Sequence, residues 1–170
     1  MKSTTQQHRR LVANLTGVAD QTTRNAANQQ TGADFEKRLD GYHAELMATG
    51  QAMIMRTNPK IRMTGPGRAA ITGKGEVDYV AFLRDGRCVH FDAKSRTGKA
   101  FSIGPDFEHQ LNWLRKIHDY GNDAGLLVHW RDYNEVRWHS VQTFEKRVRL
   151  ADGVPLPGVE WLGLFTIQGG

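Results

Sequence analysis

Two aspartates stand in a stretch of the chain that is otherwise typical of a pair of buried strands. The stretch is EVDYVAFLRDGRCVHFDAKS, residues 76–95, in which apolar residues surround Asp78 and Asp92 and Lys94 follows the second acid. The Asp-Gly pair between the two apolar runs is a strong signal for a β-hairpin. The length of its turn decides where the two acids lie, and so constrains the fold more than any other feature.

Two turn lengths are compatible with this hairpin. If Asp85 and Gly86 form a two-residue turn, Asp78 and Asp92 lie on opposite faces of the sheet, because directly opposed residues share a face. If the turn comprises residues 84–86 and ends in a left-handed Gly86, the two aspartates lie directly opposite each other. The two turns therefore predict different sites.

The distribution of apolar residues favours the three-residue turn. One face of the hairpin would then carry Val77, Tyr79, Ala81, Leu83, Val89, Phe91 and Ala93. The other face would carry Asp78, Val80, Phe82, Cys88, His90, Asp92 and Lys94. A shift of one residue would scatter the apolar set over both faces, so we expect the register that keeps one face for the core.

In this register the two acids would have Cβ atoms about 5 Å apart, and like charges at opposed positions are destabilising. Mg²⁺ or Mn²⁺ would neutralise them, with Lys94 about 6.6 Å further along the same face. The alternative is a structural cluster in which a carboxyl is protonated or paired with the lysine. A metal held by two carboxylates beside a lysine can activate water for phosphodiester hydrolysis, and we favour this interpretation.

The flanking segments predict an α/β fold. An amphipathic helix is expected at residues 31–50, with Thr31 and Asp34 as a capping box and Gly50 at its end. Further patterns predict a strand at 52–57, a helix at 105–121, a strand covered on both faces at 124–130, an edge strand at 135–141 and a closing helix at 143–150. This order predicts a mixed β-sheet flanked by helices.

The charge of the chain favours a polyanionic partner. The 170 residues include 23 Lys and Arg against 18 Asp and Glu, a net charge of +5, although a merely basic surface is the alternative. Residues 58–76 predict a long protruding loop, for which a passive loop is the alternative. Its predicted phosphate contacts are the five bases counted from Arg56 to Glu76, which are Arg56, Lys60, Arg62, Arg68 and Lys74. Arg96 and Lys99, directly after the hairpin, are either phosphate contacts or part of a solvated loop.

The remaining composition indicates one domain with a tail. Residues 1–30 predict a flexible basic arm, which is either inert or in contact with DNA, and residues 31–170 form the domain. The single cysteine, Cys88, excludes an internal disulfide, and the spacing of Cys and His matches no zinc site. Neither a membrane-spanning run nor a signal peptide is recognisable, so we expect the protein in the cytoplasm.

Several motifs occur in a characteristic order: GADFEKRL with Glu36, RTNPKI, VDYVAF, FDAKS, AFSIGPDFEHQ and GLLVHW. Together they resemble the RecU-type Holliday junction resolvases of the PD-(D/E)xK nuclease superfamily, over about residues 32–139. The resemblance implies a restriction-endonuclease-like core with a protruding stalk. It also implies a homodimer that nicks four-way DNA junctions symmetrically with Mg²⁺ or Mn²⁺, in DNA recombination and repair.

The resemblance also implies roles for individual residues. The metal ligands would be Asp78, Asp92, the carbonyl of Ala93 and Glu36, the last directly or through water. The catalytic residues would be Glu36, Asp78, Asp92, Lys94 and Gln110. Two departures are visible: Asp92 stands where many members have glutamate, and the stalk matches poorly beyond NPKI.

Two other functions share the same residues. A restriction-like or repair nuclease that cuts ordinary duplex DNA would need the same catalytic set. A junction-binding protein with a decayed active site is the third reading, although the complete set of acids and lysine argues against decay.

Overall fold

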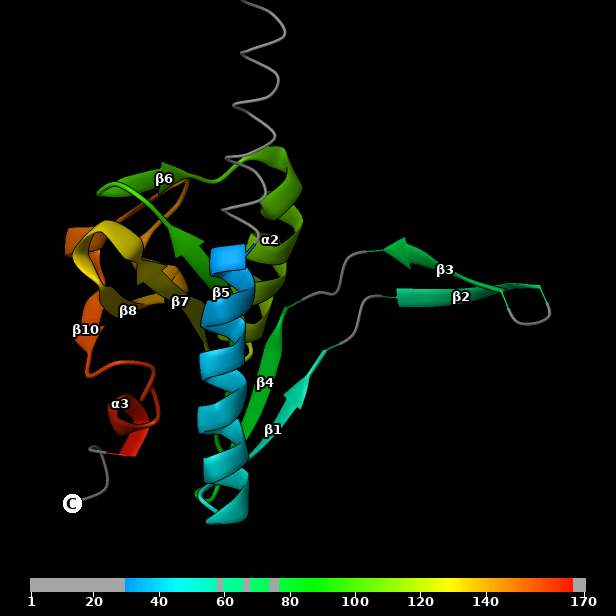
Figure 1. Ribbon diagram of the computed structural model, residues 1–170, viewed down its shortest axis with the longest axis horizontal. Coiled ribbons are helices and arrows are strands. Elements are labelled where there is room, and N and C mark those ends of the chain that lie inside the picture. The colour runs from blue at the N-terminus through cyan, green and yellow to red at the C-terminus, as the bar shows by residue number, and fades with distance from the viewer. Residues whose placement is uncertain (1–29, 58–59, 66–67, 74–76, 167–170) are drawn as a thin grey trace, which may run out of the picture.

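The structure, a computed structural model, describes residues 30–57, 60–65, 68–73 and 77–166. Its centre is a six-stranded mixed sheet with the order β1-β4-β5-β7-β8-β10 (Figure 1). The strands are β1 Ala52–Arg56, β4 Tyr79–Leu83, β5 Cys88–Arg96, β7 Asp123–Trp130, β8 Glu135–Ser140 and β10 Val154–Leu156. β5 and β7 run parallel and the other neighbours run antiparallel. The predicted α/β fold with a mixed sheet is confirmed.

Helices cover the sheet on both faces. The first helix, residues 30–48, packs Phe35 and Leu39 into one apolar cluster with Phe91 of β5. A second helix, α2 Pro105–Asp119, closes the other face with Leu111 and Leu114. β7 contributes to both clusters, which explains its continuous apolar sequence. The short α3, Gly163–Thr166, joins the first helix on its face.

The turn between β4 and β5 has three residues. The backbone N–H of Leu83 donates to the carbonyl of Arg87 at 2.9 Å, and Gly86 has φ +87°, a conformation that suits glycine. The register pairs Tyr79 with Phe91, so Asp78, one residue before β4, falls opposite Asp92. The predicted register is confirmed, except that Val77 packs in the α2-side cluster because the regular strand begins at Tyr79.

The predicted long loop at 58–76 is instead largely a β-hairpin. β2 Lys60–Gly65 and β3 Arg68–Gly73 pair antiparallel in a two-stranded sheet of their own. In Figure 1 this ribbon extends away from the six-stranded sheet, so the expected protrusion is present in a more regular form. Of the predicted arm, residues 1–30, residues 1–29 lie outside the described residues and residue 30 belongs to the first helix.

Three other expectations are corrected. Thr31 lies inside the first helix, which already includes residue 30, so it does not cap that helix. β8 is not an edge strand, because β10 pairs with it. The closing helix at 143–150 is absent, and its place is taken by η2 Val141–Thr143, β9 Arg147–Arg149 and η3 Leu150–Asp152. β9 pairs with β6 Ala100–Ser102. Along β9 the buried Val148 alternates with two exposed arginines, as is typical of a strand with one covered face.

Two buried histidines accept hydrogen bonds from tryptophans, one on each side of the sheet. Trp161 Nε1 donates to His43 Nε2 at 3.1 Å, and Trp130 Nε1 donates to His139 Nε2 at 3.2 Å. Burial lowers the pKa of each imidazole to about 4. Both rings are therefore neutral structural acceptors at neutral pH. None of the helices in the described ranges is long and apolar enough to span a membrane.

We expect acid to destabilise the protein partly through His139. Its pKa falls from the usual 6.5 to about 4 on folding, so the unfolded chain takes up a proton first, and stability is lost as pH decreases through this window. Between pH 7.5 and 4.5 the loss from this residue is about 2.5 kcal/mol. His139→Gln keeps an acceptor for Trp130 but cannot be protonated. Urea unfolding at both pH values measures the difference.

The control for this measurement is His109→Gln, which changes an exposed histidine of α2. It should lose as much stability over the pH range as the wild type. A His139→Gln variant with the same pH dependence as the wild type would contradict the buried neutral imidazole.

Candidate active site

The acidic site lies where β4 and β5 run side by side beneath α2. β5 supplies Asp92, Ala93 and Lys94, while Asp78 comes from the residue before β4 and Gln110 from α2. Because side chains alternate along a strand, Asp92 and Lys94 share the face of β5 that is turned to α2. The structure thus brings together four of the five residues in the predicted catalytic set.

Asp92 is fully buried and has partners on both carboxylate oxygens. Gln110 Nε2 donates a hydrogen bond of 3.0 Å to Oδ1, and the ammonium of Lys94 forms an ion pair with Oδ2. Lys94 Nζ also lies 4.8 Å from the centre of the Phe107 ring. The lysine is thereby held between the buried carboxylate and α2, with 19% of its side chain exposed.

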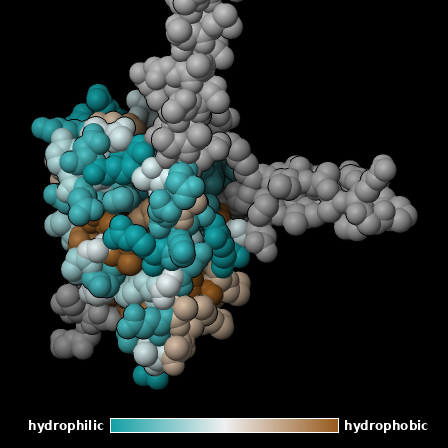
Figure 2. All heavy atoms as spheres, viewed as in Figure 1, coloured by the Kyte–Doolittle hydropathy of each residue, from teal (hydrophilic) through white to brown (hydrophobic). Residues whose placement is uncertain are grey.

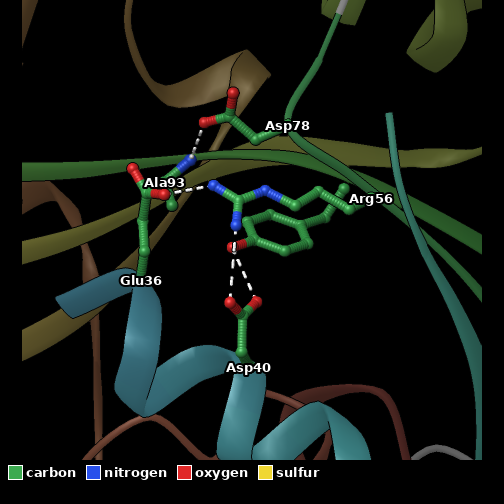
Figure 3. Close-up of polar contacts among 6 residues, drawn as sticks. Glu36, Asp40, Arg56, Asp78 and Ala93 are labelled. Carbon is green, nitrogen blue, oxygen red and sulfur yellow. Dashed lines mark hydrogen bonds and ion pairs between the residues drawn. The ribbon is translucent and has the colours of Figure 1, made fainter. Parts of the chain in front are cut away.

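Asp78 is fixed by the backbone of the strand opposite. The N–H of Ala93 donates to Asp78 Oδ2 at 3.0 Å, which orients this carboxylate across the hairpin (Figure 3). The Asp78 carboxyl also lies within hydrogen-bonding reach of Asp92. The two acids therefore face one common space.

The pKa of Asp92 is raised by burial, and the negative charge of Asp78 raises it further. The neighbouring Lys94 acts in the opposite direction without cancelling the effect. A buried acid beside a second carboxylate strongly favours either a proton or an additional cation at this position.

Glu36 belongs to a second charged cluster at the edge of the first. Its carboxylate forms an ion pair with Arg56 at the end of β1, and Arg56 Nη1 lies 3.4 Å from Asp40 Oδ2. The hydroxyl of Tyr79 donates to Asp40 Oδ1 at 3.2 Å, and the guanidinium lies 5.6 Å from the Tyr79 ring centre. In Figure 3 the Glu36 side chain points from the first helix toward the segment at Ala93.

Sequence reasoning missed this second cluster. Arg56 was counted among the bases of the basic loop, whereas the structure places it in β1 beside the first helix. A usable signal was present, because Glu36 and Asp40 are four residues apart on one helix face. Their common partner, however, depends on a contact between residues 16 and 20 positions apart.

The donor set suits a hard divalent cation. Asp78 and Asp92 supply carboxylate oxygens, and the Ala93 carbonyl directly follows Asp92 in the chain. Within the described residues, no three His, Cys, Asp or Glu side chains converge on one point. Glu36, engaged with Arg56, stays a predicted third acid. The fully buried carboxylate of Asp92, opposite that of Asp78, is the observation that fits the site to a cation.

The predicted DNA-contacting bases are spread more widely. Arg96 lies at the end of β5 with its guanidinium 5.0 Å from the Phe101 ring centre, and Lys99 is exposed just before β6. Lys60, Arg62 and Arg68 lie on β2 and β3, but their side chains are outside what the structure describes. Lys74 falls outside the described residues altogether.

A mixed sheet between helices, with opposed aspartates and a lysine on neighbouring strands, defines an α/β nuclease core. The family model described as RecU, Recombination protein U, matches residues 31–153. The chain therefore belongs to the RecU family, and the resemblance to Holliday junction resolvases that its motifs carry is confirmed. It is a DNA-binding nuclease of that class.

Comparisons with individual proteins add little to this assignment. No curated protein matches the chain in sequence. Among solved structures it is similar to Hjc of Archaeoglobus fulgidus, a Holliday junction resolvase from an archaeal hyperthermophile. That match has 17% identity and a TM-score of 0.48, and covers 73% of this chain and 95% of the other.

We expect Lys94→Met to destabilise the protein more at pH 8 than at pH 5. The substitution leaves the Asp92 carboxylate buried without the Lys94 ammonium, which lowers the free energy of unfolding by about 3 kcal/mol when the carboxyl is ionised. Loss of Lys94 also raises the pKa of Asp92 further, so at pH 5 the carboxyl is protonated and the cost is smaller. Urea unfolding in EDTA at both pH values measures this.

Two further variants bracket the result. Asp92→Asn/Lys94→Met removes both charges and should recover most of the loss at pH 8. Lys116→Met, on the exposed side of α2, should change stability by less than about 0.5 kcal/mol. An equal loss at both pH values would contradict the pairing.

Proposed function

We propose that this protein resolves Holliday junctions by metal-dependent hydrolysis of phosphodiester bonds, as part of DNA recombination and repair. The observation that carries the proposal is the pairing of Asp78 with a fully buried Asp92, with Lys94 bound to the second acid. Structural sites seldom bury a carboxylate beside another one without a reason in binding or catalysis. Membership of the RecU family agrees with this chemistry.

Asp78, Asp92 and the carbonyl of Ala93 would hold Mg²⁺ or Mn²⁺, with Glu36 as a further acid. The bound metal would lower the pKa of a water and neutralise charge that develops on the phosphate. The chain prepares for this by fixing both carboxylates before any ligand arrives, Asp78 through the Ala93 N–H and Asp92 through Gln110. Such preorganisation avoids rearrangement during the reaction.

With a metal bound, Lys94 and Gln110 would contact the DNA as well as Asp92. A cation held by Asp92 would balance the charge that Lys94 now pairs with, and the Lys94 ammonium could then contact the scissile phosphate, to steady negative charge or pass a proton. The Gln110 amide lies in the same space and can donate to a phosphate oxygen. Arg56 holds Glu36 in an ion pair, and a cation bound nearby would have to compete with it.

The projecting β2–β3 hairpin is the feature that favours a branched DNA substrate rather than an ordinary duplex. A two-stranded ribbon whose sequence carries Lys60, Arg62 and Arg68 suits the open centre of a four-way junction. We assign junction selection to this ribbon. Mg²⁺-dependent catalysis is assigned to the β4–β5 site.

We expect the protein with Mg²⁺ to nick an immobile four-way junction at symmetric positions and to leave a linear duplex of the same sequence uncut. Asp78→Asn keeps an acceptor for the Ala93 N–H but loses the charge, so it should bind the junction normally and nick it at least about 100-fold more slowly. Denaturing gels with Mg²⁺ or EDTA measure nicking, and band shifts in EDTA measure binding.

The control is Asp34→Asn, which removes an exposed carboxylate of the first helix and should leave nicking unchanged. Equal cutting of the duplex would favour a restriction-like or repair nuclease. Junction binding without nicking in Mg²⁺ or Mn²⁺ would favour an inactive binding protein. Full activity of Asp92→Ala and Lys94→Ala would refute the site assignment.

Symmetric nicking requires two active sites, and an exposed apolar face supports a homodimer. Met53, Met55 and Phe82 are 57%, 50% and 36% exposed, and Met53 pairs with Phe82 across β1 and β4. They lie beyond the area that α2 covers. Figure 2 shows apolar atoms gathered on the side of the molecule where β1 lies. We assign this face to a second copy of the chain.

We therefore expect Phe82→Glu to shift the protein from dimer to monomer in multi-angle light scattering, because it would bury a charge in the interface. Its nicks should no longer be coupled on the two strands. Val154→Glu, an exposed apolar position on β10 at the other edge of the sheet, should remain dimeric. A wild-type monomer that still nicks symmetrically would contradict the homodimer.

A further inference from the structure

A second concave surface lies outside the active site, next to the small sheet of β6 and β9. It is a pocket of about 650 Å³. The charged residues of its lining are all bases, namely Lys99, Arg137, Arg147 and Arg149. The ring of Tyr133, 38% exposed, forms another part of the wall. We call this surface the basic pocket.

The arginines of β9 are presented to solvent by the strand itself. Arg147 and Arg149 alternate with the fully buried Val148, so both point away from the core. Their partners across the sheet, Ser102 and Ala100, are too small to cover them. The local structure therefore leaves two guanidinium groups accessible on one face.

Most of this charge is not neutralised. In the part of the chain that the structure describes, no ion pair engages Lys99, Arg147 or Arg149. Arg137 differs, because it pairs with Glu135 at 2.7 Å and donates to the carbonyl of Gly153. Three bases thus remain available to an anionic ligand.

Further bases connect the basic pocket to the active site. Arg96 follows Asp92 and Lys94 on the same face of β5, and it is close enough to Asp92 for their charges to interact. Its guanidinium packs on Phe101 of β6, the strand that borders the pocket. Figure 1 shows β6 beyond the carboxyl end of β5. Positive charge therefore continues from the catalytic lysine toward the pocket.

Another concavity of about 820 Å³, between α2 and residues 141–146, shows that such charge is not a general property of the surface. Its lining mixes three acids with bases, the acids being Glu108, Asp119 and Glu145. A polyanion would gain little there, because attraction and repulsion offset each other. The basic pocket is the surface complementary to a phosphate backbone.

We propose that the basic pocket binds the sugar-phosphate backbone of the duplex arm that leads away from the scissile phosphate. The inference rests on the proposed function and names the part of the substrate held outside the catalytic centre. β5 advances about 3.3 Å per residue, so Arg96 lies roughly 13 Å along the strand from Asp92, and the pocket lies beyond it. At 3.4 Å per base pair, its contacts fall about four or more base pairs from the nick.

The test measures dissociation constants of Arg147→Ala/Arg149→Ala for a four-way junction and for a 30-base-pair duplex, in EDTA over a range of salt concentrations. Because backbone contacts are independent of sequence and branching, affinity for both DNAs should fall about tenfold at low salt. The slope of log affinity against log salt should become shallower by about 2, one for each lost contact.

The matched control is Arg84→Ala/Lys116→Ala, which removes two exposed bases at the β4–β5 turn and on α2. It should bind both DNAs within twofold of the wild type. Arg147→Lys/Arg149→Lys should recover most of the affinity and the salt slope, because it restores the charges.

The possible outcomes distinguish failure of the inference from failure of the proposed function. Wild-type affinity and slope in Arg147→Ala/Arg149→Ala would overturn the inference while the wild type still nicks junctions. Weaker binding of the junction with unchanged binding of the duplex would also overturn it, because the contact would then lie at the branch point. A wild type that neither binds nor nicks junctions would overturn the proposed function and this inference together.

Discussion

The turn at Gly86 fixes the register of β4 against β5, and the proposed active site depends on that register. With three residues in the turn, Asp78 meets Asp92 and the aromatic residues of both strands enter the core on the other face. A two-residue turn would place one aspartate among those aromatics, where neither a metal nor water could reach it. The same backbone choice therefore determines the packing of the sheet and the position of its acids.

Burial of Asp92 is costly, and the surrounding elements share the task of compensating it. Lys94 of the same strand and Gln110 of the covering helix stabilise the carboxylate, whereas the opposing Asp78 carboxyl adds to the cost. On the other side of the sheet, Arg56 holds Glu36 and Asp40 of the first helix. Residues of both helical layers thus contact the polar groups around this hairpin. The site therefore depends on the helices as well as on the sheet.

The sequence was informative where a signal is local. Alternation of apolar residues and the Asp-Gly pair predicted the β4–β5 register, and helical spacing predicted the first helix and α2. It failed where partners are distant or segments are short. β9 has three residues, and its basic pattern fits a helix as well as a strand until β6 is there to pair with it. The glycines and prolines of residues 58–76 predicted a loop there. The short strands β2 and β3 of this ribbon are likewise recognisable only through their pairing with each other.

The arrangement of β5 and β7 has a consequence for how the enzyme matures. These neighbours run parallel, so the chain must cross over through α2 before they can pair, and Gln110 lies on that crossover. Contacts of this kind close a long loop and form late during folding. A newly made chain could assemble the β4–β5 hairpin early, yet it would lack the covering helix that holds Asp92. The chain would therefore gain the ability to cut DNA only when the whole domain has folded.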